Sequence, residues 1–558
     1  MSSKKSSLSV LPALLAAVLL PLLIGTVRAA TPDRLAATPP MGWNDWAHYQ
    51  CDYTAATIVA NARALVRTGL AARGYDTVTI DDCWMMKTRD SQGNLQPDPR
   101  LFPQGMKPVA AAIHGLGLKF GIYEDAGSET CGRFAGSGEP QGGGNAHFLA
   151  DARLFASWGV DYLKLDGCNV YVRKGESEND AYRAAYRAES NALAQVGRPI
   201  VFSESAPAYF QGQPGWYDVL SWVRGDGQLW REGTDMANYH TRNPPRSRFA
   251  SVLWNYSYNL PLGRFQTPGN WNDPDFIIGG DVGMTLAESR SQLALWAMMS
   301  APLILSSDVS RLTPAAVRIL GNRAVLSVDQ DPLGRMATLL RRSASSDVLI
   351  KPLRGAGYAV AVLNRSAAAL PARLTPADLG FGGSACRFDA SNLWSGGHQT
   401  AVTALRAHIA AHDTAIWTIR PNSACGTPAR IGAITRVLPS PTDDDNHPNA
   451  GRYTRCVAAP GTVQPCTGSS AESWEVQADG ALRSGGKCLQ QKGDRAVLAA
   501  CSSGADQAWH YDLLGRLINS ASRRCLTGSA SGALSVAACG NNPPSQIWGL
   551  PNDLSVSD

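Results

Sequence analysis

The sequence predicts a multidomain chain made of a (β/α)8 TIM barrel, an antiparallel β-sandwich and a β-trefoil, in that order. Eight short apolar runs alternate with helix-like stretches between about residues 40 and 308, which is the pattern of a (β/α)8 barrel. Beyond residue 331, short runs alternate with turns and long helices are absent, and near the end of the chain a Cys, Cys, Trp unit occurs three times. The 558 residues exceed what one compact domain usually holds, so several domains are expected.

Residues 33–332 are predicted to form the barrel. Between the strand candidates, segments such as Thr57–Thr68, Lys107–Gly115 and Ala146–Trp158 carry apolar residues at helical spacing. Several strand candidates end in polar or acidic residues, and the active sites of such barrels are built at the C-terminal ends of the strands. The strand candidates are Pro40–Trp46, Thr77–Asp82, Lys119–Asp125, Tyr162–Asp166, Pro199–Ser203, Leu229–Asp235, Phe276–Ile278 and Pro302–Ser306.

Residues 333–422 are predicted to form a small antiparallel β-sandwich. Short apolar runs separated by turns are typical of such a domain, and Cys386 and Cys425 are expected to pair across it. Residues 423–450 are predicted to be a linker, because residues 437–449 hold three prolines and three consecutive aspartates. The apolar runs are Val348–Pro352, Tyr358–Leu363 and Ala415–Ile419.

Residues 451–552 carry the threefold repeat, which resembles the ricin-type β-trefoil lectin module. The units are Cys456, Cys466 and Trp474; Cys488, Cys501 and Trp509; and Cys525, Cys539 and Trp548. In modules of this type each Trp is a core residue and each Cys pair staples a loop. Such lectins also place an Asp soon after the first Cys, where this chain has Ala458, Gln490 and Thr527. The trefoil fold therefore does not by itself predict sugar binding.

Residues 1–29 are predicted to be a secretory signal peptide. Lys4 and Lys5 precede the apolar run Leu8–Ile24, and Val27–Ala29 fits a small-residue cleavage site. The alternative is a membrane anchor, but the run contains two prolines and is short for a membrane span. Export predicts a secreted protein, extracellular or periplasmic, whose 12 cysteines can form disulfides.

The composition argues against several kinds of partner. The net charge of +5 is small for this length and no basic patch stands out, so nucleic acid is not an expected partner. No segment after the leader is apolar enough to cross a membrane. No CxxC pair and no His/Cys cluster occurs, so metal binding is not expected. The 15 Trp residues suit stacking on sugar rings, although Trp also fills large cores.

Asp166 and Asp235 are the candidate catalytic residues, because each ends a strand-like run of the predicted barrel. Two carboxyl groups in one cleft can stabilise an oxocarbenium-like transition state and protonate the leaving oxygen, as glycoside hydrolysis requires. Lys164 points the same way as Asp166 on a strand, and its ammonium would favour the nucleophilic carboxylate. Arg231, four residues before Asp235, could bind sugar hydroxyls. A single Asp at a strand end can also be a helix cap, but that explanation fits a whole set of such acids less well.

Six sequence blocks resemble, in order, those of the retaining α-galactosidases of glycoside hydrolase family 27. The resemblance extends over residues 33–420, which covers the predicted barrel and sandwich. The blocks are Pro40–Trp46, Ile80–Trp84, Gly121–Gly127, Tyr162–Cys168, Trp271–Asp275 and Asp329–Gly334.

The resemblance implies that Asp166 is the nucleophile and Asp235 the acid/base of a double displacement. It implies that Asp81 and Asp82 bind O4 and O6 of galactose and that Trp46 forms an apolar wall. Disulfides Cys51–Cys83 and Cys131–Cys168 are also implied, and neither a metal nor an organic cofactor is needed. The other residues expected to line the pocket are Tyr123, Lys164, Ser205, Arg231 and Asp275.

Asp226 is a second candidate for the acid/base. The family pattern is Trp-Arg, three residues and then Asp. The run Trp230–Asp235 has that spacing, and Trp222–Asp226 does not. The pattern therefore favours Asp235.

The block after the fifth strand departs from the family where it shapes the pocket around C2 of the sugar. Family members commonly have Cys and Trp where Glu204 and Ala206 stand, and typical α-galactosidases have a larger acid at Ser205. Ser205 with Ala208 instead resembles α-N-acetylgalactosaminidases, whose small residues leave space for an acetamido group. Glu204 is either a new sugar ligand or a solvated loop acid, and Glu124 replaces a residue that is usually small.

The predicted function is that of a retaining exo-glycosidase that hydrolyses terminal α-D-galactosyl residues, with possible polysaccharide binding by the trefoil. Alternatives within the family are an α-N-acetylgalactosaminidase, a β-L-arabinopyranosidase and an isomalto-dextranase. An alternative of another class is a catalytically inactive carbohydrate-binding protein, which the presence of both candidate acids disfavours. The aromatic-rich stretch between Asp235 and Trp271 is either an extra wall for the leaving group or a packed insertion.

Overall fold

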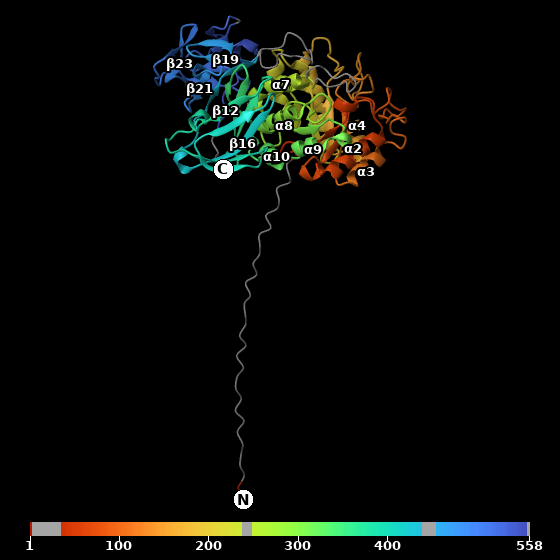
Figure 1. Ribbon diagram of the computed structural model, residues 1–558. Coiled ribbons are helices and arrows are strands. Elements are labelled where there is room, and N and C mark those ends of the chain that lie inside the picture. Colours follow the sequence, from red (N-terminus) through yellow and green to blue (C-terminus); the bar gives the residue numbers. More distant parts are fainter. Residues whose placement is uncertain (3–34, 237–247, 438–453, 530, 555–558) are drawn as a thin grey trace. The chain divides into compact units, whose positions relative to one another are not determined.

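The computed structural model describes residues 1–2, 35–236, 248–437, 454–529 and 531–554 (Figure 1). All helices and strands of the described residues belong to one unit, Leu35–Asp558. The predicted signal peptide lies outside the described residues, apart from its first two positions. Within the described ranges, no helix combines the length and apolar character that a bilayer crossing needs.

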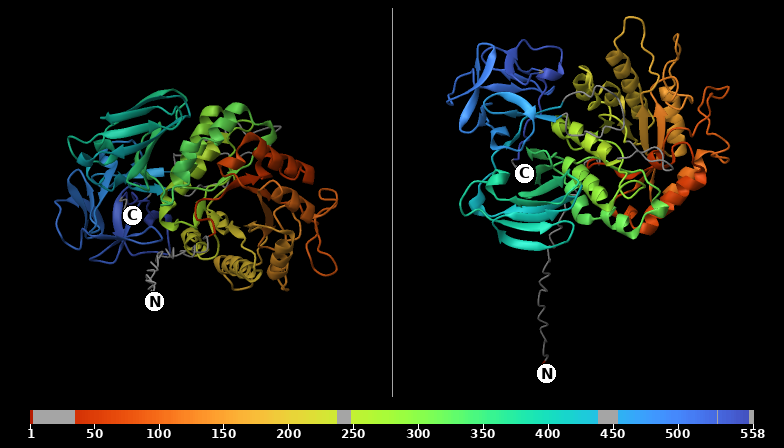
Figure 2. Two further views of the ribbon diagram at one scale, coloured as in Figure 1. Left: turned by 90° about the horizontal axis from the view of Figure 1, so that it is seen from below. Right: turned by 45° about the horizontal axis from the view of Figure 1, so that its top comes forward.

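Eight parallel strands form the predicted barrel, and helices surround them (Figure 2). The strand order is β7-β6-β5-β4-β3-β2-β1-β8, and Ile277, beyond β7, bridges Leu305 in β8 and closes the ring. The strands are β1 (Met41–Asn44), β2 (Thr77–Ile80), β3 (Lys119–Asp125), β4 (Tyr162–Asp166), β5 (Val201–Glu204), β6 (Leu229–Arg231), β7 (Trp271–Asp273) and β8 (Leu303–Leu305). The α-helices are α1 (Trp46–Tyr49), α2 (Ala55–Thr68), α3 (Met106–His114), α4 (Phe148–Trp158), α5 (Glu178–Gln195), α6 (Trp216–Val223), α7 (Arg248–Asn259), α8 (Leu286–Met299), α9 (Pro314–Leu320) and α10 (Arg323–Asp329).

Local sequence signals set the ends of several helices. Thr54 and Thr57 form a capping box at the start of α2, and Gly69 ends that helix with a φ of 80°. Thr285 and Glu288 form the same kind of box at the start of α8. These caps satisfy backbone groups that would otherwise lack partners inside the helix.

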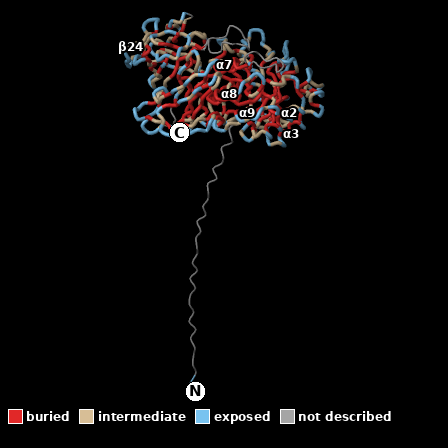
Figure 3. The backbone as a smooth tube through the Cα atoms, in the orientation of Figure 1, coloured by how far each residue is buried: buried red, intermediate tan, exposed pale blue. Residues whose placement is uncertain are grey.

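The aromatic stretch before Trp271 is a packed insertion in its described part. All 12 residues of α7 are buried, and Figure 3 shows α7 and α8 as mostly buried tube. The ring of Trp216 packs edge-on against that of Tyr258 with centroids 5.5 Å apart. Residues 237–247, the rest of the stretch, lie outside the described part of the chain.

Two predicted strands are corrected. The seventh strand is β7, not Phe276–Ile278, where only the isolated bridge of Ile277 forms. The sixth strand ends at Arg231, so Asp235 lies in the loop beyond it. The chain leaves the sheet where Gly233 packs so closely on Gln211 that a Cβ would lie 2.2 Å from its amide nitrogen.

Strand register determines which side chains face the barrel interior, because side chains alternate along a strand. Tyr123 is in register with Lys164, and Lys164 with Ser203. Lys164 reaches Asp81 across the interior at 2.8 Å. Asp166 comes two residues after Lys164, so its side chain also faces the barrel interior.

The side chains of Glu124 and Glu204 face away from the barrel interior. Both residues are in register with Leu165, which lies between Lys164 and Asp166 on β4 and faces the other way. Both are 0% exposed, so Glu204 is neither a sugar ligand in the barrel interior nor a solvated loop acid. It packs on Gly227, where an added Cβ would lie 2.4 Å from its Oε1. Burial, followed by the charge of Asp226, raises the pKa of Glu204 well above its usual value.

Four buried glutamates are each expected to lower the stability of the fold as the pH rises. Burial raises the pKa values of Glu124, Glu189, Glu204 and Glu232 well above the usual range. An acid whose pKa is higher in the folded state loses stability as the pH rises from its unfolded pKa, about 4.3, toward its folded pKa. Glu189→Gln is therefore expected to raise the apparent Tm by a few degrees at about pH 8 and not at about pH 4. Thermal unfolding checks this, with the exposed Glu178→Gln on the same helix as control; equal shifts at both pH values would contradict it.

The predicted β-sandwich is confirmed. A six-stranded sheet, in the order β14-β13-β16-β11-β10-β9, accompanies a two-stranded sheet of β12 and β15. The three predicted runs lie in β10, β11 and β16, and Cys386 and Cys425 form a disulfide. The strands are β9 (Thr338–Arg342), β10 (Ser346–Leu353), β11 (Gly357–Asn364), β12 (Leu370–Leu374), β13 (Phe388–Asn392), β14 (His398–Val402), β15 (Leu405–Ile409) and β16 (Thr414–Pro421).

A fully buried lysine, Lys351, joins the sandwich to the barrel. Its Nζ donates to the carbonyls of Ala297 and Val328 at 2.7 and 2.6 Å and to the hydroxyl of Ser300 at 2.7 Å. These acceptors lie at the C-terminal ends of α8 and α10, where a positive charge is favourable.

The third domain is built of short strands in a nine-stranded and a three-stranded sheet. Its three predicted Cys pairs are formed, and its repeated Trp residues are buried. The strands are β17 (Ile431–Ala433), β18 (Thr435–Val437), β19 (Thr454–Ala458), β20 (Thr462–Pro465), β21 (Ser473–Val476), β22 (Leu482–Ser484), β23 (Lys487–Lys492), β24 (Arg495–Ala499), β25 (Trp509–Tyr511), β26 (Leu517–Asn519), β27 (Cys525–Gly528) and β28 (Leu534–Ala537).

The repeated sequence motif builds the three lobes in the same way. Each indole N–H donates to the carbonyl of the residue after the first Cys: Trp474 to Val457, Trp509 to Leu489 and Trp548 to Leu526, at 2.7, 2.9 and 3.1 Å. The residue two before each Trp accepts from the N–H after the second Cys: Glu472 from Thr467, Gln507 from Ser502 and Gln546 from Gly540, at 3.0, 2.8 and 2.8 Å. These side chains therefore serve the fold of each lobe.

Strands β17 and β18 lie inside the predicted linker. They pair with β21 and β19, so this part of the segment already belongs to the sheets of the third domain. Residues 438–450 lie outside the described residues, and their role as a linker stays a prediction.

Candidate active site at the C-terminal rim of the barrel

Asp166 lies at the end of β4, where three donors orient its carboxylate. The hydroxyl of Tyr209 donates to Oδ1 at 2.6 Å, and the N–H of Gly167 donates to the same oxygen at 2.9 Å. The hydroxyl of Tyr123 donates to Oδ2 at 3.3 Å. Asp166 is only partly buried, so the oriented carboxylate keeps contact with solvent.

Tyr209 is a residue of this site that sequence reasoning did not assign. It belongs to the 3-10 helix η2 (Ala206–Phe210), which follows β5 on the same rim. Its hydroxyl also lies 3.1 Å from Sγ of Cys168. Its position in the loop after the fifth strand could have indicated a site residue. Its contact with Asp166, however, depends on the tertiary structure.

Tyr209→Phe is expected to lower kcat by about 10- to 100-fold with little change in KM. The variant removes a donor that holds the candidate nucleophile and keeps the ring, so binding in the ground state is expected to persist. Steady-state kinetics on an aryl α-galactoside give both parameters. An unchanged kcat, or a rise in KM alone, would contradict a positioning role.

Asp81 lies at the centre of a second group of bonds. Lys164 Nζ and Asn44 Nδ2 donate to its Oδ2 at 2.8 and 2.6 Å, and its N–H donates to Asp45 at 2.7 Å. Burial lowers the pKa of Lys164, but the carboxylates of Asp81 and Asp166 raise it by more, so the ammonium is charged. The direct hydrogen-bond partner of Lys164 is thus Asp81, whereas Asp166 acts on it through space.

Asp82 is held at both carboxyl oxygens by backbone N–H groups. Cys83 donates to Oδ1 at 2.6 Å and Gly132 donates to Oδ2 at 2.8 Å. Burial raises the pKa of Asp82 to about 6. Both disulfides implied by the resemblance are formed, one through Cys83 and the other through Cys131 beside Gly132. The disulfides therefore anchor the two loops that orient this carboxyl group.

Arg231 connects Asp235 to the interior of the barrel. Its Nη2 donates to Asp235 at 2.8 Å, and its Nη1 lies 3.1 Å from Asp275. Burial lowers the pKa of Arg231, but the charges of Asp275 and Asp235 raise it by more. The Asp235 side chain is 51% exposed, whereas the arginine side chain is 7% exposed. A buried cation thus holds a half-exposed carboxyl group.

Trp46 and Ser205 lie at the ends of β1 and β5. The N–H of Trp46 donates to Asn44 at 2.8 Å, and its ring is partly buried. Ser205 is 3% exposed and immediately precedes η2. Both residues are therefore on the rim that carries Asp166.

Asp226 does not contribute to this rim. Its carboxylate pairs with Arg187 on α5, and its carbonyl accepts from the hydroxyl of Ser190 at 2.8 Å. It is 7% exposed between the strands and the helices. Asp226, the second candidate for the acid/base, is thus ion-paired with a helix of the outer layer.

Asp125 is a second site residue without an assigned role in the sequence. It accepts from the N–H of Cys168 at 3.1 Å, and burial followed by the charge of Asp166 raises its pKa. With Cys131 and Cys168 it makes the one group of metal-ligand residue types found in the described ranges. The two sulfurs are bonded to each other, so they offer no thiolate to a metal.

Comparisons with known proteins agree with this architecture. The profile described as "Alpha galactosidase A" matches residues 38–331, the "Alpha galactosidase C-terminal beta sandwich domain" matches 343–419, and the "Ricin-type beta-trefoil lectin domain" matches 450–548. The α-galactosidase A of Aspergillus niger is 34% identical over 553 residues, which cover 96% of this chain and 97% of that protein.

Solved structures match about 70% of the chain. The crystal structure of α-galactosidase I from Mortierella vinacea is 29% identical with a TM-score of 0.60, over 71% of this chain and 100% of that one. The α-galactosidase of Saccharomyces cerevisiae is 26% identical with a TM-score of 0.60, over 70% and 98%. With the matches of all three domains, this similarity shows that the chain belongs to the α-galactosidases of glycoside hydrolase family 27 and carries a C-terminal ricin-type β-trefoil.

Proposed function

We propose that the protein is a secreted retaining exo-glycosidase that removes terminal α-D-galactosyl residues from oligo- or polysaccharides. The observation that supports this most is the pair of carboxyl groups on the barrel rim. Asp166 is oriented by three donors, and half-exposed Asp235 is held by buried Arg231. Glycoside hydrolysis needs one carboxylate at the anomeric carbon and one proton donor at the leaving oxygen.

The proposed reaction is a double displacement. An oxygen of Asp166 attacks the anomeric carbon, and the bond to the leaving group breaks as Asp235 gives its proton to the leaving oxygen. Asp235 then takes a proton from water, whose oxygen attacks the same carbon and releases Asp166. Two inversions return the α configuration. This mechanism predicts carboxyl groups about 5–5.5 Å apart, whereas about 9 Å would favour inversion.

Asp81 and Asp82 are the proposed ligands of O4 and O6 of the galactosyl ring. Their carboxyl groups are oriented by Lys164, Asn44 and two backbone N–H groups. An oriented acceptor favours the epimer whose hydroxyl reaches it, because the other epimer leaves a buried polar group unpaired.

The first test is the hydrolysis of four p-nitrophenyl glycosides: α-D-galactoside, α-N-acetylgalactosaminide, β-L-arabinopyranoside and α-glucoside. The α-galactoside is expected to give the highest kcat/KM. No turnover of any of them would favour the inactive carbohydrate-binding alternative.

Ser205 and Ala208 favour α-N-acetylgalactosaminidase activity as a second candidate, since both side chains are small and follow β5. Ser205→Glu is expected to lower kcat/KM for the α-N-acetylgalactosaminide at least about tenfold relative to the galactoside, because the longer acid would fill the acetamido space. Kinetics on both substrates check this, with Ser203→Ala as a control for a small change on the same strand. Equal losses on both substrates would contradict a role in selectivity.

Export is proposed from the leader sequence and is supported by the six disulfides, which use all 12 cysteines. Binding of polysaccharide by the trefoil is proposed from its domain type alone. The repeated Trp and Gln side chains already have structural partners, so other residues of the lobes would have to contact sugar.

A further inference from the structure

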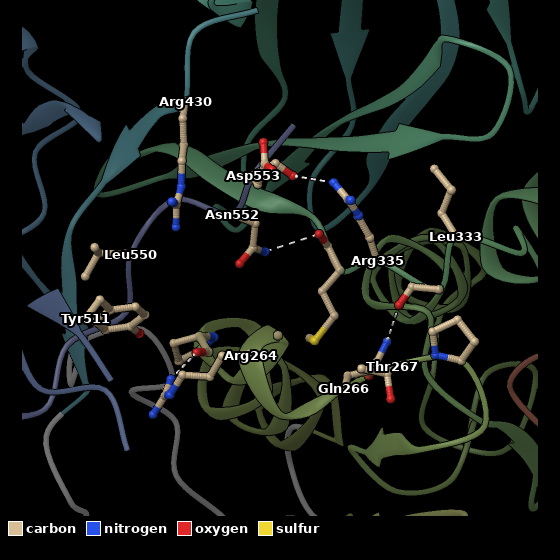
Figure 4. A pocket seen from close by; sticks show the side chains of 15 residues that line it. Arg264, Gln266, Thr267, Leu333, Arg335, Arg430, Tyr511, Leu550, Asn552 and Asp553 are labelled. Carbon is tan, nitrogen blue, oxygen red and sulfur yellow. Dashed lines mark hydrogen bonds between the residues drawn. The ribbon is translucent and has the colours of Figure 1, made fainter. Parts of the chain in front are cut away.

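A cavity of about 420 Å³ lies where the three domains meet (Figure 4). It is formed by the 3-10 helix η3 (Leu260–Phe265) of the barrel and the residues that follow it, the segment before β9, Arg430 just before β17, and Tyr511 and the last residues of the trefoil. Its volume is in the range of small-ligand sites. The apolar part of its wall comprises Pro261, Pro268, Leu333, Met336, Tyr511 and Leu550.

The charged part of the wall holds three arginines and one acid, which are Arg264, Arg335, Arg430 and Asp553. Arg264 joins the barrel to the trefoil through hydrogen bonds. Its Nε and Nη2 donate to the trefoil carbonyls of Leu513 and Leu514 at 2.7 and 3.0 Å. Arg335 donates through Nη1 to the carbonyl of Asp553 at 3.2 Å. Both arginines therefore bind backbone carbonyls of the protein, and neither is the expected main ligand of an anion in the cavity.

Arg430 is different, because its end group extends into the cavity (Figure 4). Its Nε donates to the carbonyl of Pro551 at 2.6 Å, which fixes the guanidinium plane. No described residue accepts a hydrogen bond from its Nη1 or Nη2. Burial lowers the pKa of Arg430, and the nearby charge of Asp553 only partly opposes this. The Nη1 and Nη2 groups of Arg430 are thus partly desolvated hydrogen-bond donors in a guanidinium group of fixed orientation.

Hydrogen bonds and buried apolar contacts hold the cavity wall near Arg430. Asn552 donates through Nδ2 to the carbonyls of Met336 and Ala337 at 3.2 and 3.0 Å, and its N–H donates to the hydroxyl of Thr338 at 2.8 Å. Leu554 is 1% exposed in the core of the sandwich. These contacts attach the end of the trefoil segment to the sandwich domain and hold this side of the cavity in place.

We propose that this cavity is a second carbohydrate site that takes a sugar bearing a carboxylate, such as a uronic acid, with Arg430 as the carboxylate ligand. A fork of two N–H donors matches a carboxylate in a bidentate geometry. The apolar wall suits the C–H face of a pyranose, and the fixed Oδ1 of Asn552 can accept from a hydroxyl. A dianion fits less well, because Asp553 stands on the same wall.

Isothermal titration of the full-length protein with D-galacturonic acid tests this, in the presence of enough D-galactose to occupy the barrel site. One site per chain is expected to bind. Arg430→Gln is expected to weaken this binding by about 10- to 100-fold. The matched control Arg420→Gln, an exposed arginine of the sandwich, is expected to leave it unchanged. Leu550→Trp, which fills the cavity and keeps every arginine, is expected to abolish it.

Several results would overturn the proposal. They are the absence of binding, binding that galactose displaces, binding unaffected by Arg430→Gln or by Leu550→Trp, and inorganic phosphate binding as tightly as the uronic acid. Thermal unfolding of each variant separates loss of the site from loss of the fold. The outcome is independent of the proposed catalysis, because hydrolysis of the aryl galactoside is measured separately.

Discussion

Asp166→Asn is expected to lower kcat on an aryl α-galactoside by at least about 10⁴-fold while the protein remains folded. An amide cannot form the glycosyl ester, and the hydrogen-bond donors around it would remain in place. The loss is therefore expected in kcat more than in KM. Stopped assays with a large excess of enzyme, together with thermal unfolding, measure the activity and the fold.

A smaller variant of the same residue identifies its chemical role. Asp166→Gly leaves space at the anomeric carbon, and azide is expected to attack there, expel the aryl group and give the β-galactosyl azide. The product has the inverted configuration because only one displacement occurs. Near-normal activity of Asp166→Asn, or an α-azide from Asp166→Gly, would show that Asp166 is not the nucleophile.

Asp235→Ala is expected to slow hydrolysis of an α-galactosyl oligosaccharide by about 10²- to 10⁴-fold and that of a dinitrophenyl galactoside much less. A sugar leaving group needs the proton, whereas dinitrophenolate leaves without one. Kinetics on a series of aryl galactosides give the dependence of rate on leaving-group pKa. A steeper dependence than in the wild type supports proton donation by Asp235.

The matched control is Asp226→Asn, because Asp226 was the rival from the sequence and pairs with Arg187 in the helix layer. It is expected to retain kcat and a normal leaving-group dependence. With azide, Asp235→Ala is expected to give the α-galactosyl azide, since the glycosyl intermediate still forms on Asp166. The same steep dependence in Asp226→Asn, and a normal one in Asp235→Ala, would reverse the assignment.

The fold class was predictable because its signals are local. Apolar runs at strand and helix spacing indicated the barrel, and the Cys, Cys, Trp repeat indicated the trefoil. Boundaries were less predictable where packing ends a strand. Gly233 packs on Gln211 and ends β6 at Arg231, and β17 extends the trefoil sheet into the predicted linker.

The residues of the candidate site could be predicted from the sequence, but the hydrogen bonds between them were harder to predict. Spacing along β4 placed Lys164 and Asp166 on one face, but it could not show that Lys164 bonds to Asp81. It also could not show that Tyr209 orients Asp166. Such contacts join segments far apart in the chain, so no local pattern reports them.

The sequence by itself determined the order of the domains, the Cys pairs of the trefoil and the choice of Asp166 and Asp235 as candidate acids, because each follows from short-range periodicity or spacing. Only the tertiary structure decided that Glu124 and Glu204 face the helices, that Arg231 bridges Asp235 and Asp275, and that three arginines gather where the domains meet. The arginine contacts join segments that are far apart in the chain, and for the two glutamates the physical reason is strand register. A shift of one residue exchanges the two faces of a strand, and register is fixed by the packing of the whole barrel and its neighbours.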